Sequence, residues 1–304
     1  MGRLAVRQAR HRSWIKRYFL HPVQGSIVVF FFQILRILPL KFALLLGASL
    51  GKTVGVFAYH RNKIAFKNLE FAFPDISLAE KKRIVRCMWA NLGRTFASGM
   101  HLKALLKTAE FVNPSDIKKV KDYQNGGFIF SAHIGNWEVI SELAHVMGVN
   151  IACVYRPANN PWIERFIFKK RKGVLIPKGL HGSRILIKTL KDKHFVAMLS
   201  DQKLNEGIDA PFLNHDAKSP TAMAELMVKM KLPVLPCLSV WKNNSTLKIE
   251  LFPPLKMPLT GDHQQKVYDI TCQMNNIMQQ WIRTYPEQWF WLHRRFDKKL
   301  YTDV

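Results

Sequence analysis

One stretch, residues 128–138, constrains the fold more than any other part of the sequence. It reads Phe-Ile-Phe-Ser-Ala-His-Ile-Gly-Asn-Trp-Glu, so an apolar run suited to a buried strand passes directly into a polar turn. Apolar residues at helical spacing follow, and Gly148 is a plausible stop. The stretch therefore predicts a strand, a turn and a helix. His133 would lie at the carboxyl end of the strand, and Asn136 would cap the helix.

His133 and Glu138 form a candidate general-base pair. On a continuous helix a spacing of five would turn the two side chains well apart, but a turn lets the carboxylate fold back towards the imidazole. A carboxylate on one ring nitrogen fixes the tautomer and raises the basicity of the other nitrogen, which can then take a proton from a hydroxyl. The residues alone leave a plainer alternative, in which His133 ends a strand and Glu138 is an ordinary acidic residue of a first helical turn.

Strand-like and helical segments alternate along most of the chain, which predicts an α/β protein. Strands are expected at 151–155, 174–176, 195–199, 233–238 and 247–251, and helices at 78–92, 161–168, 222–230 and 264–284. Because ligands bind beyond the carboxyl ends of strands in open α/β sheets, we expect His133, Arg156 and Asp201 to lie at one edge. The alternative for the segment after Leu199 is a tight polar loop without a function.

The first 52 residues differ in composition from the rest. Residues 1–21 are basic, and the apolar segment 26–50 is interrupted by Arg36, Pro39 and Lys41. Within this segment, no run without charges reaches the roughly 18 residues of a membrane helix. Both flanks are basic, so a helix that lies in the membrane plane and breaks at Pro39 satisfies the charges better than a span. We predict an anchor over 1–52 and a catalytic domain over 53–304.

The chain is strongly basic, with 46 Lys and Arg residues against 21 Asp and Glu residues and a formal net charge of +25. This excess predicts a polyanionic partner, but it does not choose among nucleic acid, an anionic membrane and phosphorylated or acidic substrates. The run Lys169–Lys172, which contains Arg171, fits a phosphate site or a solvated face equally well. The four cysteines are far apart, and a metal site at His133, Glu138 and His145 lacks a strong ligand spacing.

Several blocks resemble the bacterial lipid A secondary acyltransferases, and more loosely the glycerolipid acyltransferases. The most specific is His-Ile-Gly-Asn-Trp-Glu at 133–138. The others are Asn-Leu-Glu-Phe-Ala-Phe-Pro at 68–74, Asn-Leu-Gly-Arg-Thr at 91–95, Asp-Gln-Lys-Leu-Asn-Glu-Gly at 201–207 and Pro-Glu-Gln-Trp-Phe-Trp-Leu-His-Arg-Arg at 286–295. On physical grounds alone, the aromatic and basic residues of the last block suit a membrane interface or a packed lid equally well.

The resemblance implies a glycerolipid-acyltransferase-like fold, with a mixed central sheet flanked by helices and an N-terminal apolar membrane-anchoring helix. It implies transfer of a fatty acyl chain from acyl carrier protein to a hydroxyl on an acyl chain of the lipid A precursor, without a metal or other cofactor and without a nucleic-acid partner. The reaction would take place at the cytoplasmic face of the anionic inner membrane.

The resemblance also implies roles for individual residues. His133 would deprotonate the acceptor hydroxyl, and Glu138 would hold the imidazole. The oxyanion would be stabilised by backbone N–H groups near Asn136 or by Arg171. Substrate-binding residues would be Asn136, Arg156, Arg171, Asp201, Gln202 and Lys203.

Two alternatives remain open at this point. One is an acyltransferase for another membrane lipid, such as a glycerophospholipid or a phosphatidylinositol mannoside. The other is a membrane-tethered nucleic-acid-binding protein, supported only by charge and by the interleaving of basic and aromatic residues.

Overall fold

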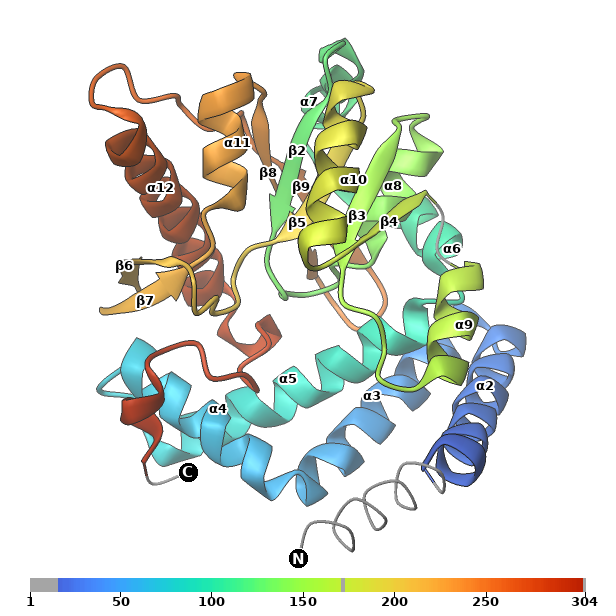
Figure 1. The fold of residues 1–304 in the computed structure, drawn as a ribbon. Helices are drawn as coiled ribbons and strands as arrows, with labels where there is room; N and C mark the ends of the chain where they lie inside the picture. Colours follow the sequence, from blue (N-terminus) through green and yellow to red (C-terminus); the bar gives the residue numbers. More distant parts are fainter. Residues whose placement is uncertain (1–15, 171–172, 303–304) are drawn as a thin grey trace, which may run out of the picture.

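A seven-stranded mixed sheet forms the centre of the protein in the computed structural model, which describes residues 16–170 and 173–302 (Figure 1). The predicted site residue Arg171 lies outside these residues. The strands, in their order across the sheet, are β1 (Glu110–Val112), β9 (Leu247–Leu251), β8 (Val234–Trp241), β2 (Gly127–Ser131), β5 (Phe195–Leu199), β3 (Ile151–Tyr155) and β4 (Val174–Pro177). Neighbours from β8 to β4 are parallel, whereas β9 is antiparallel to β8. The predicted fold class is confirmed.

Helices cover both faces of the sheet, which explains why β2 and β8 are buried along their whole length. One face carries α10 (Leu180–Lys191), α11 (Ala222–Met230) and α12 (His263–Thr284), and the other carries α6 (Leu102–Lys107), α7 (Pro114–Lys119) and α8 (Val139–Val146) (Figure 1). Alternate residues of β2 point to opposite faces: Phe128 and Phe130 join the first core, and Ile129 joins the second.

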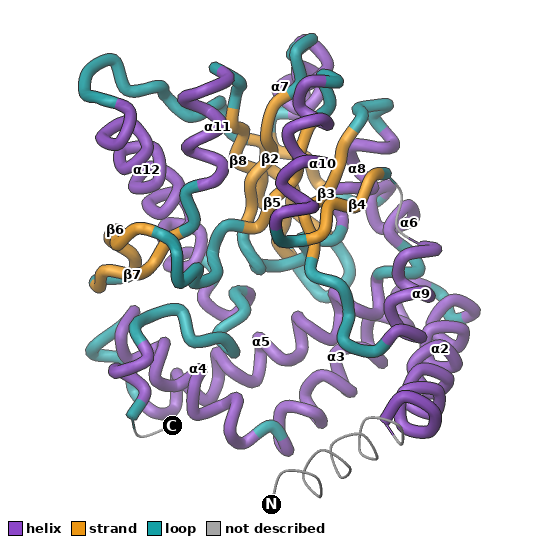
Figure 2. Tube along the Cα trace, viewed as in Figure 1, coloured by secondary structure: helices purple, strands orange, loops and turns teal. Residues whose placement is uncertain are grey.

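A layer of long helices runs across the carboxyl ends of the parallel strands (Figures 1 and 2). It consists of α3 (Leu40–Phe57), α4 (Tyr59–Ala72) and α5 (Leu78–Ser98). Ser77 caps α5 as predicted, because its hydroxyl accepts a hydrogen bond from the backbone N–H of Glu80 at 3.1 Å. Residues 91–95, for which the sequence allows an extension or a turn, extend the helix to Ser98, and this brings Thr95 and Ser98 under the loop that follows β2.

Small residues hold α3 tightly against α5. A Cβ atom at Gly51 would lie 2.1 Å from the carbonyl oxygen of Trp89, and one at Gly93 would lie 2.0 Å from that of Gly47. Backbones can approach this closely only where side chains are missing. The predicted boundary at residue 52 therefore falls inside a helix that packs on the α/β body, and the division into anchor and domain stays a prediction.

The apolar N-terminal segment forms two helices rather than one. The first, α2 (His21–Ile37), is separated from α3 by Leu38 and Pro39, so the break lies where the sequence predicts it. Helix α2 also packs on α9 (Pro161–Lys170), where the ring centroids of Phe32 and Phe166 are 5.4 Å apart. By length and composition, the helical stretches 18–37 and 40–57 could each cross a membrane.

The remaining elements are short. They are the hairpin of β6 (Ile208–Phe212) and β7 (His215–Ser219), the π-helix at Lys16–Leu20, and 3-10 turns at Val120–Asp122, Pro286–Gln288 and Lys298–Tyr301. The sequence did not predict the hairpin. Its two-residue turn has positive φ at Leu213 and Asn214, at 47° and 66°, and Leu-Asn is not one of the residue pairs that signal such a turn.

Candidate active site

The register of the sheet brings His133 and Asp201 together. Ser131 at the end of β2 pairs with Leu199 at the end of β5, so the residue two places beyond each strand lies beside the other. Nδ1 of His133 is 2.8 Å from Oδ1 of Asp201, and the backbone N–H of His133 donates to Oδ2 at 3.0 Å. We call His133 and Asp201 the catalytic pair, because a catalytic role is proposed for them below.

The carboxylate of Asp201 is fully buried and ionised. Burial alone would raise its pKa. The charge and hydrogen bond of His133, the nearby His293 and the indole N–H of Trp289, which donates to Oδ2 at 2.7 Å, together hold the pKa well below its ordinary value. An ionised carboxylate only accepts hydrogen bonds. Nδ1 of His133 must therefore carry the hydrogen, so Nε2 carries the lone pair that can take a proton.

The imidazole of His133 is partly open to solvent. The His133 side chain is 21% exposed, whereas that of Asp201 is 0% exposed. The rings of Trp137 and Phe290 flank the imidazole, with centroids 5.3 and 6.2 Å away. The side-chain nitrogen of Gln202 is 3.4 Å from Nε2. A hydroxyl that approaches Nε2 of His133 therefore meets a base and the amide donor of Gln202 together.

Glu138 does not occupy the position on Nδ1 that the sequence analysis gave it. Asp201 holds that position, because the neighbouring strand β5 delivers a carboxylate in register, whereas Glu138 lies at the start of α8. There Glu138 accepts a hydrogen bond from the indole N–H of Trp137 at 3.2 Å. A catalytic role for Glu138 stays a prediction, but the carboxylate that orients the imidazole is Asp201.

The side chain of Asn136 does not cap α8 but is buried between the turn and α5. Helix α8 begins at Val139 with Glu138 as its N-cap, and the fully buried Asn136 side chain donates to the hydroxyl of Ser98 at 2.9 Å. The expectation that Asn136 caps the helix is therefore wrong. A side chain buried in this way ties the turn to α5, and its proposed contact with substrate is not supported by this geometry.

The backbone N–H groups of the turn are also occupied. Gly135 donates to the carbonyl of Gln288 and Asn136 to that of Ser239, both at 3.0 Å. Of the backbone N–H groups near Asn136 that were expected to stabilise an oxyanion, those of Gly135 and Asn136 are therefore not available. Gly135 has φ of +55°, and a Cβ atom there would lie 2.1 Å from the carbonyl oxygen of Ser239, so only glycine fits this turn.

The predicted basic residues lie further out on the same edge. Arg156 directly follows β3 and is exposed. Because β5 lies between β2 and β3, Arg156 is two strand spacings, or about 10 Å, from the end of β2. Lys203 is half-buried, two residues beyond Asp201. Both residues border the catalytic pair without contacting it.

The C-terminal segment, residues 286–296, completes the site, and the sequence analysis assigned it no site residue. Trp289 pairs with Ile134 in an antiparallel bridge, and the N–H of Phe290 donates to the carbonyl of His133 at 2.9 Å. Trp289 and Trp291 are both 0% exposed. The segment is thus a packed lid and not a membrane-facing patch. The three aromatic residues at 289–291 were the signal, but only the fold shows what they cover.

Two buried basic side chains lie behind the pair. Burial lowers the pKa of His293 to about 4, although Asp201 opposes this shift, so the imidazole is neutral at pH 7. Burial also lowers the pKa of Arg295 to about 10, and its guanidinium stacks on the ring of Phe212 at 4.3 Å. Across the described part of the chain, no cluster of three or more His, Cys, Asp or Glu side chains could hold a metal ion.

Comparison with known proteins places the chain in a family. Residues 14–298 match the family profile described as bacterial lipid A biosynthesis acyltransferase. The lipid A biosynthesis lauroyltransferase of Escherichia coli K12 is 25% identical over 274 residues, which cover 85% of this chain and 86% of that protein. The palmitoleoyltransferase of the same strain is 24% identical over the same shares of the two chains. A lipid A biosynthesis acyltransferase of Haemophilus influenzae is 22% identical over 93% of this chain and 90% of its own length. The protein belongs to the bacterial lipid A biosynthesis acyltransferase family.

Proposed function

We propose that this enzyme transfers a fatty acyl chain from the thioester of acyl carrier protein to a hydroxyl on an acyl chain of the lipid A precursor. The observation that carries the proposal is the catalytic pair: a histidine whose Nδ1 is held by a buried carboxylate and whose side chain is partly exposed. Among the described residues, no serine, threonine or cysteine side chain hydrogen-bonds Nε2 of His133, so the pair forms a general base that suits direct transfer between two substrates.

The chemistry follows from this geometry. Nε2 of His133 takes the proton of the acceptor hydroxyl while the hydroxyl oxygen attacks the carbonyl carbon of the thioester. Asp201 stabilises the imidazolium that forms, because its carboxylate is already ionised and bonded to Nδ1. When the tetrahedral intermediate collapses, the C–S bond breaks, the carrier leaves as a thiolate, and the imidazolium returns the proton to it.

A donor for the oxyanion is the next requirement, since the turn N–H groups of Gly135 and Asn136 are already bonded. The side-chain amide of Gln202 lies 3.4 Å from Nε2 of His133, so it is placed to donate to the thioester oxygen. Arg171 remains a sequence-based candidate for the same task.

The acceptor and donor are both anionic, which fits the net charge of +25. Arg156 is placed to bind a phosphate of the acceptor, because it is exposed at the edge where the catalytic pair lies. Lys203 lies at the same edge on the other side of Asp201 in sequence. A guanidinium donates two parallel hydrogen bonds to a phosphate, whereas an ammonium acts as a point charge.

The enzyme works, on this proposal, at the cytoplasmic face of the inner membrane with α2 and α3 lying in the membrane plane. Exposed apolar side chains line their outer faces, among them Phe30, Ile37, Val56 and Phe57. Helix α3 is locked to α5, whose first turns carry several charged residues, so α3 would not enter the bilayer alone as a spanning helix. Shallow insertion keeps the carboxyl edge of the sheet next to the lipid acceptor.

A reconstituted transfer assay tests this function. Purified enzyme in mixed micelles would receive an acyl thioester on either acyl carrier protein or coenzyme A, and either the lipid A precursor or a glycerophospholipid. We expect ester formation on the lipid A precursor with the carrier-protein donor, seen by mass spectrometry. Transfer to the glycerophospholipid alone would contradict the proposed acceptor. Equal rates with the acyl carrier protein and coenzyme A thioesters would contradict the proposed donor.

A further inference from the structure

Trp289 makes a contact that no sequence signal assigns. Its indole N–H donates to Oδ2 of Asp201 at 2.7 Å. Among the described residues, the only other donor to this oxygen is the backbone N–H of His133, at 3.0 Å. A buried ionised carboxylate depends on such donors, because it has lost its water. Without the indole, Oδ2 would keep a single hydrogen bond.

The main chain of Trp289 is held by the loop that carries His133. The main chain of Trp289 is paired with Ile134, next to His133, while its side chain reaches Asp201 at the end of β5. Trp289 therefore joins the two loops that carry the catalytic pair. Both hydrogen bonds that flank the bridge, Gly135 to Gln288 and Phe290 to His133, are within 3.0 Å.

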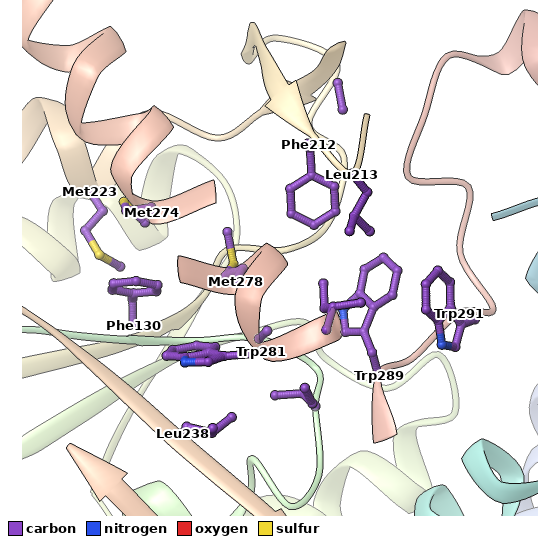
Figure 3. Packing of buried hydrophobic residues seen from close by; sticks show 14 of the residues in the cluster. Phe130, Phe212, Leu213, Met223, Leu238, Met274, Met278, Trp281, Trp289 and Trp291 are labelled. Atoms are coloured by element: carbon purple, nitrogen blue, oxygen red, sulfur yellow. The ribbon is translucent and has the colours of Figure 1, made fainter. Parts of the chain in front are cut away.

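Packing fixes the orientation of the ring. Figure 3 shows Trp289 between Phe212 and Trp291 in the core beside α12. Its ring centroid is 4.6 Å from that of Trp291 in an edge-to-face arrangement, and 6.0 Å from that of Phe212. An indole enclosed in this way presents its N–H along one direction only, so it limits how the carboxylate can rotate.

We propose that Trp289 is a positioning residue of the transfer reaction, whose indole N–H holds the Asp201 carboxylate in the plane that bonds Nδ1 of His133. The inference rests on the proposed function, since it acts through the catalytic pair. The charged and titratable groups that face Asp201 are His133, His293 and Arg295. The indole is the neutral donor among these groups, and it orients the carboxylate without adding a charge.

The chain supplies a matched control in Trp291. This tryptophan is also 0% exposed, and its indole N–H also donates a hydrogen bond, which is partly buried, to the carbonyl of Pro286 at 2.6 Å. Trp289→Phe and Trp291→Phe therefore remove the same group from the same core. Only the first removes a donor from the catalytic pair.

The test compares the two variants in kcat, KM and the pH profile of kcat/KM. We expect Trp289→Phe to lower kcat roughly 10–100-fold with KM nearly unchanged, as for other residues that orient a reacting group. The acidic limb of the kcat/KM profile of this variant should move to higher pH. A carboxylate that accepts fewer hydrogen bonds is more basic, so it stabilises the imidazolium of His133 more strongly. Trp291→Phe should keep the wild-type profile. Equal losses of kcat and equal pH profiles in the two variants would show that Trp289 is only a core residue.

A spectroscopic measurement keeps the inference testable without turnover and without a folded Trp289→Phe variant. In wild-type protein the indole proton of Trp289 should resonate downfield of that of Trp137, because Trp289 donates to a buried carboxylate at 2.7 Å whereas Trp137 donates to Glu138 at 3.2 Å. Asp201→Asn should shift this signal upfield, and Trp291→Phe should leave it in place. An unshifted signal in Asp201→Asn would contradict the contact. Because no substrate is needed, absence of transfer to the lipid A precursor would count against the proposed function alone.

Discussion

The catalytic centre and the N-terminal helices are built in opposite ways. At the centre, the loops after β2 and β5 and the C-terminal segment are buried and joined by hydrogen bonds between residues far apart in sequence, such as His133, Asp201 and Trp289. Helices α2 and α3 arise from a local apolar pattern and leave large side chains in contact with solvent. The difference indicates that the centre must be rigid before substrate arrives, whereas the helices are completed by a second surface, which we propose is the membrane.

The largest expected effect concerns the two acidic residues of the centre. Asp201→Asn should lower kcat by about 10⁴-fold, because an amide cannot stabilise the imidazolium and favours the wrong tautomer. Glu138→Gln should lower it less, by roughly 10²–10³-fold, because Glu138 is not the partner of Nδ1. Single-turnover rates of the two variants, with thermal unfolding as a control for folding, measure this difference. A larger loss in Glu138→Gln would reverse the assignment.

The second prediction concerns the buried imidazole of His293. Its folded pKa of about 4 lies below the ordinary value of 6.5, so the unfolded chain binds more protons between these two pH values. Stability should therefore be complete above pH 6.5 and fall by about 3 kcal/mol as the pH drops to 4. His293→Phe should flatten this part of the pH dependence in denaturant titrations. An unchanged slope in that variant would mean that other groups cause the loss.

The third prediction tests whether α3 belongs to the α/β body. Gly51→Ala should lower the free energy of unfolding by about 1–3 kcal/mol, because the new methyl group meets the Trp89 carbonyl oxygen. Gly99→Ala is the control, since its Cβ atom would meet only the Phe96 carbonyl oxygen, at 3.3 Å. Equal stabilities of the two variants, measured by chemical denaturation, would show that α3 can separate from α5.

The smallest effect concerns the outer face of α3. Phe57 is 82% exposed, and Phe57→Asp should weaken binding to anionic vesicles roughly tenfold without changing the thermal unfolding temperature. Leu259→Asp is the matched control, because Leu259 is 95% exposed in the loop before α12. Vesicle sedimentation compares the two. Similar losses in both variants would show that charge alone weakens binding and that α3 has no special contact.

The sequence predicted local features well in both regions. The strand, turn and helix around His133, the cap at Ser77 and the break at Pro39 all follow from residue patterns within a few positions. The mixed α/β sheet followed from the alternation of such patterns. These features depend on periodicity and on turn chemistry, which a single sequence displays directly.

The partners of these features were not predictable in the same way. Local spacing favoured Glu138 as the partner of His133, but the register of β2 against β5 decides for Asp201. Asn136 carried the signature of a cap, yet a buried contact with Ser98 took its side chain. Sheet order, strand register and the path of the C-terminal segment determine these contacts. None of the three can be predicted from residues that are neighbours in the sequence.

The central claim is that Asp201, and not Glu138, orients the base, and the nitrogen resonances of the His133 side chain test it most directly. In wild-type protein at neutral pH, ¹H–¹⁵N spectra of selectively labelled histidine should show a hydrogen on Nδ1 and a bare Nε2, with the Nδ1 proton far downfield. We predict that this pattern is lost in Asp201→Asn and retained in Glu138→Gln. Loss in Glu138→Gln with retention in Asp201→Asn would contradict the account.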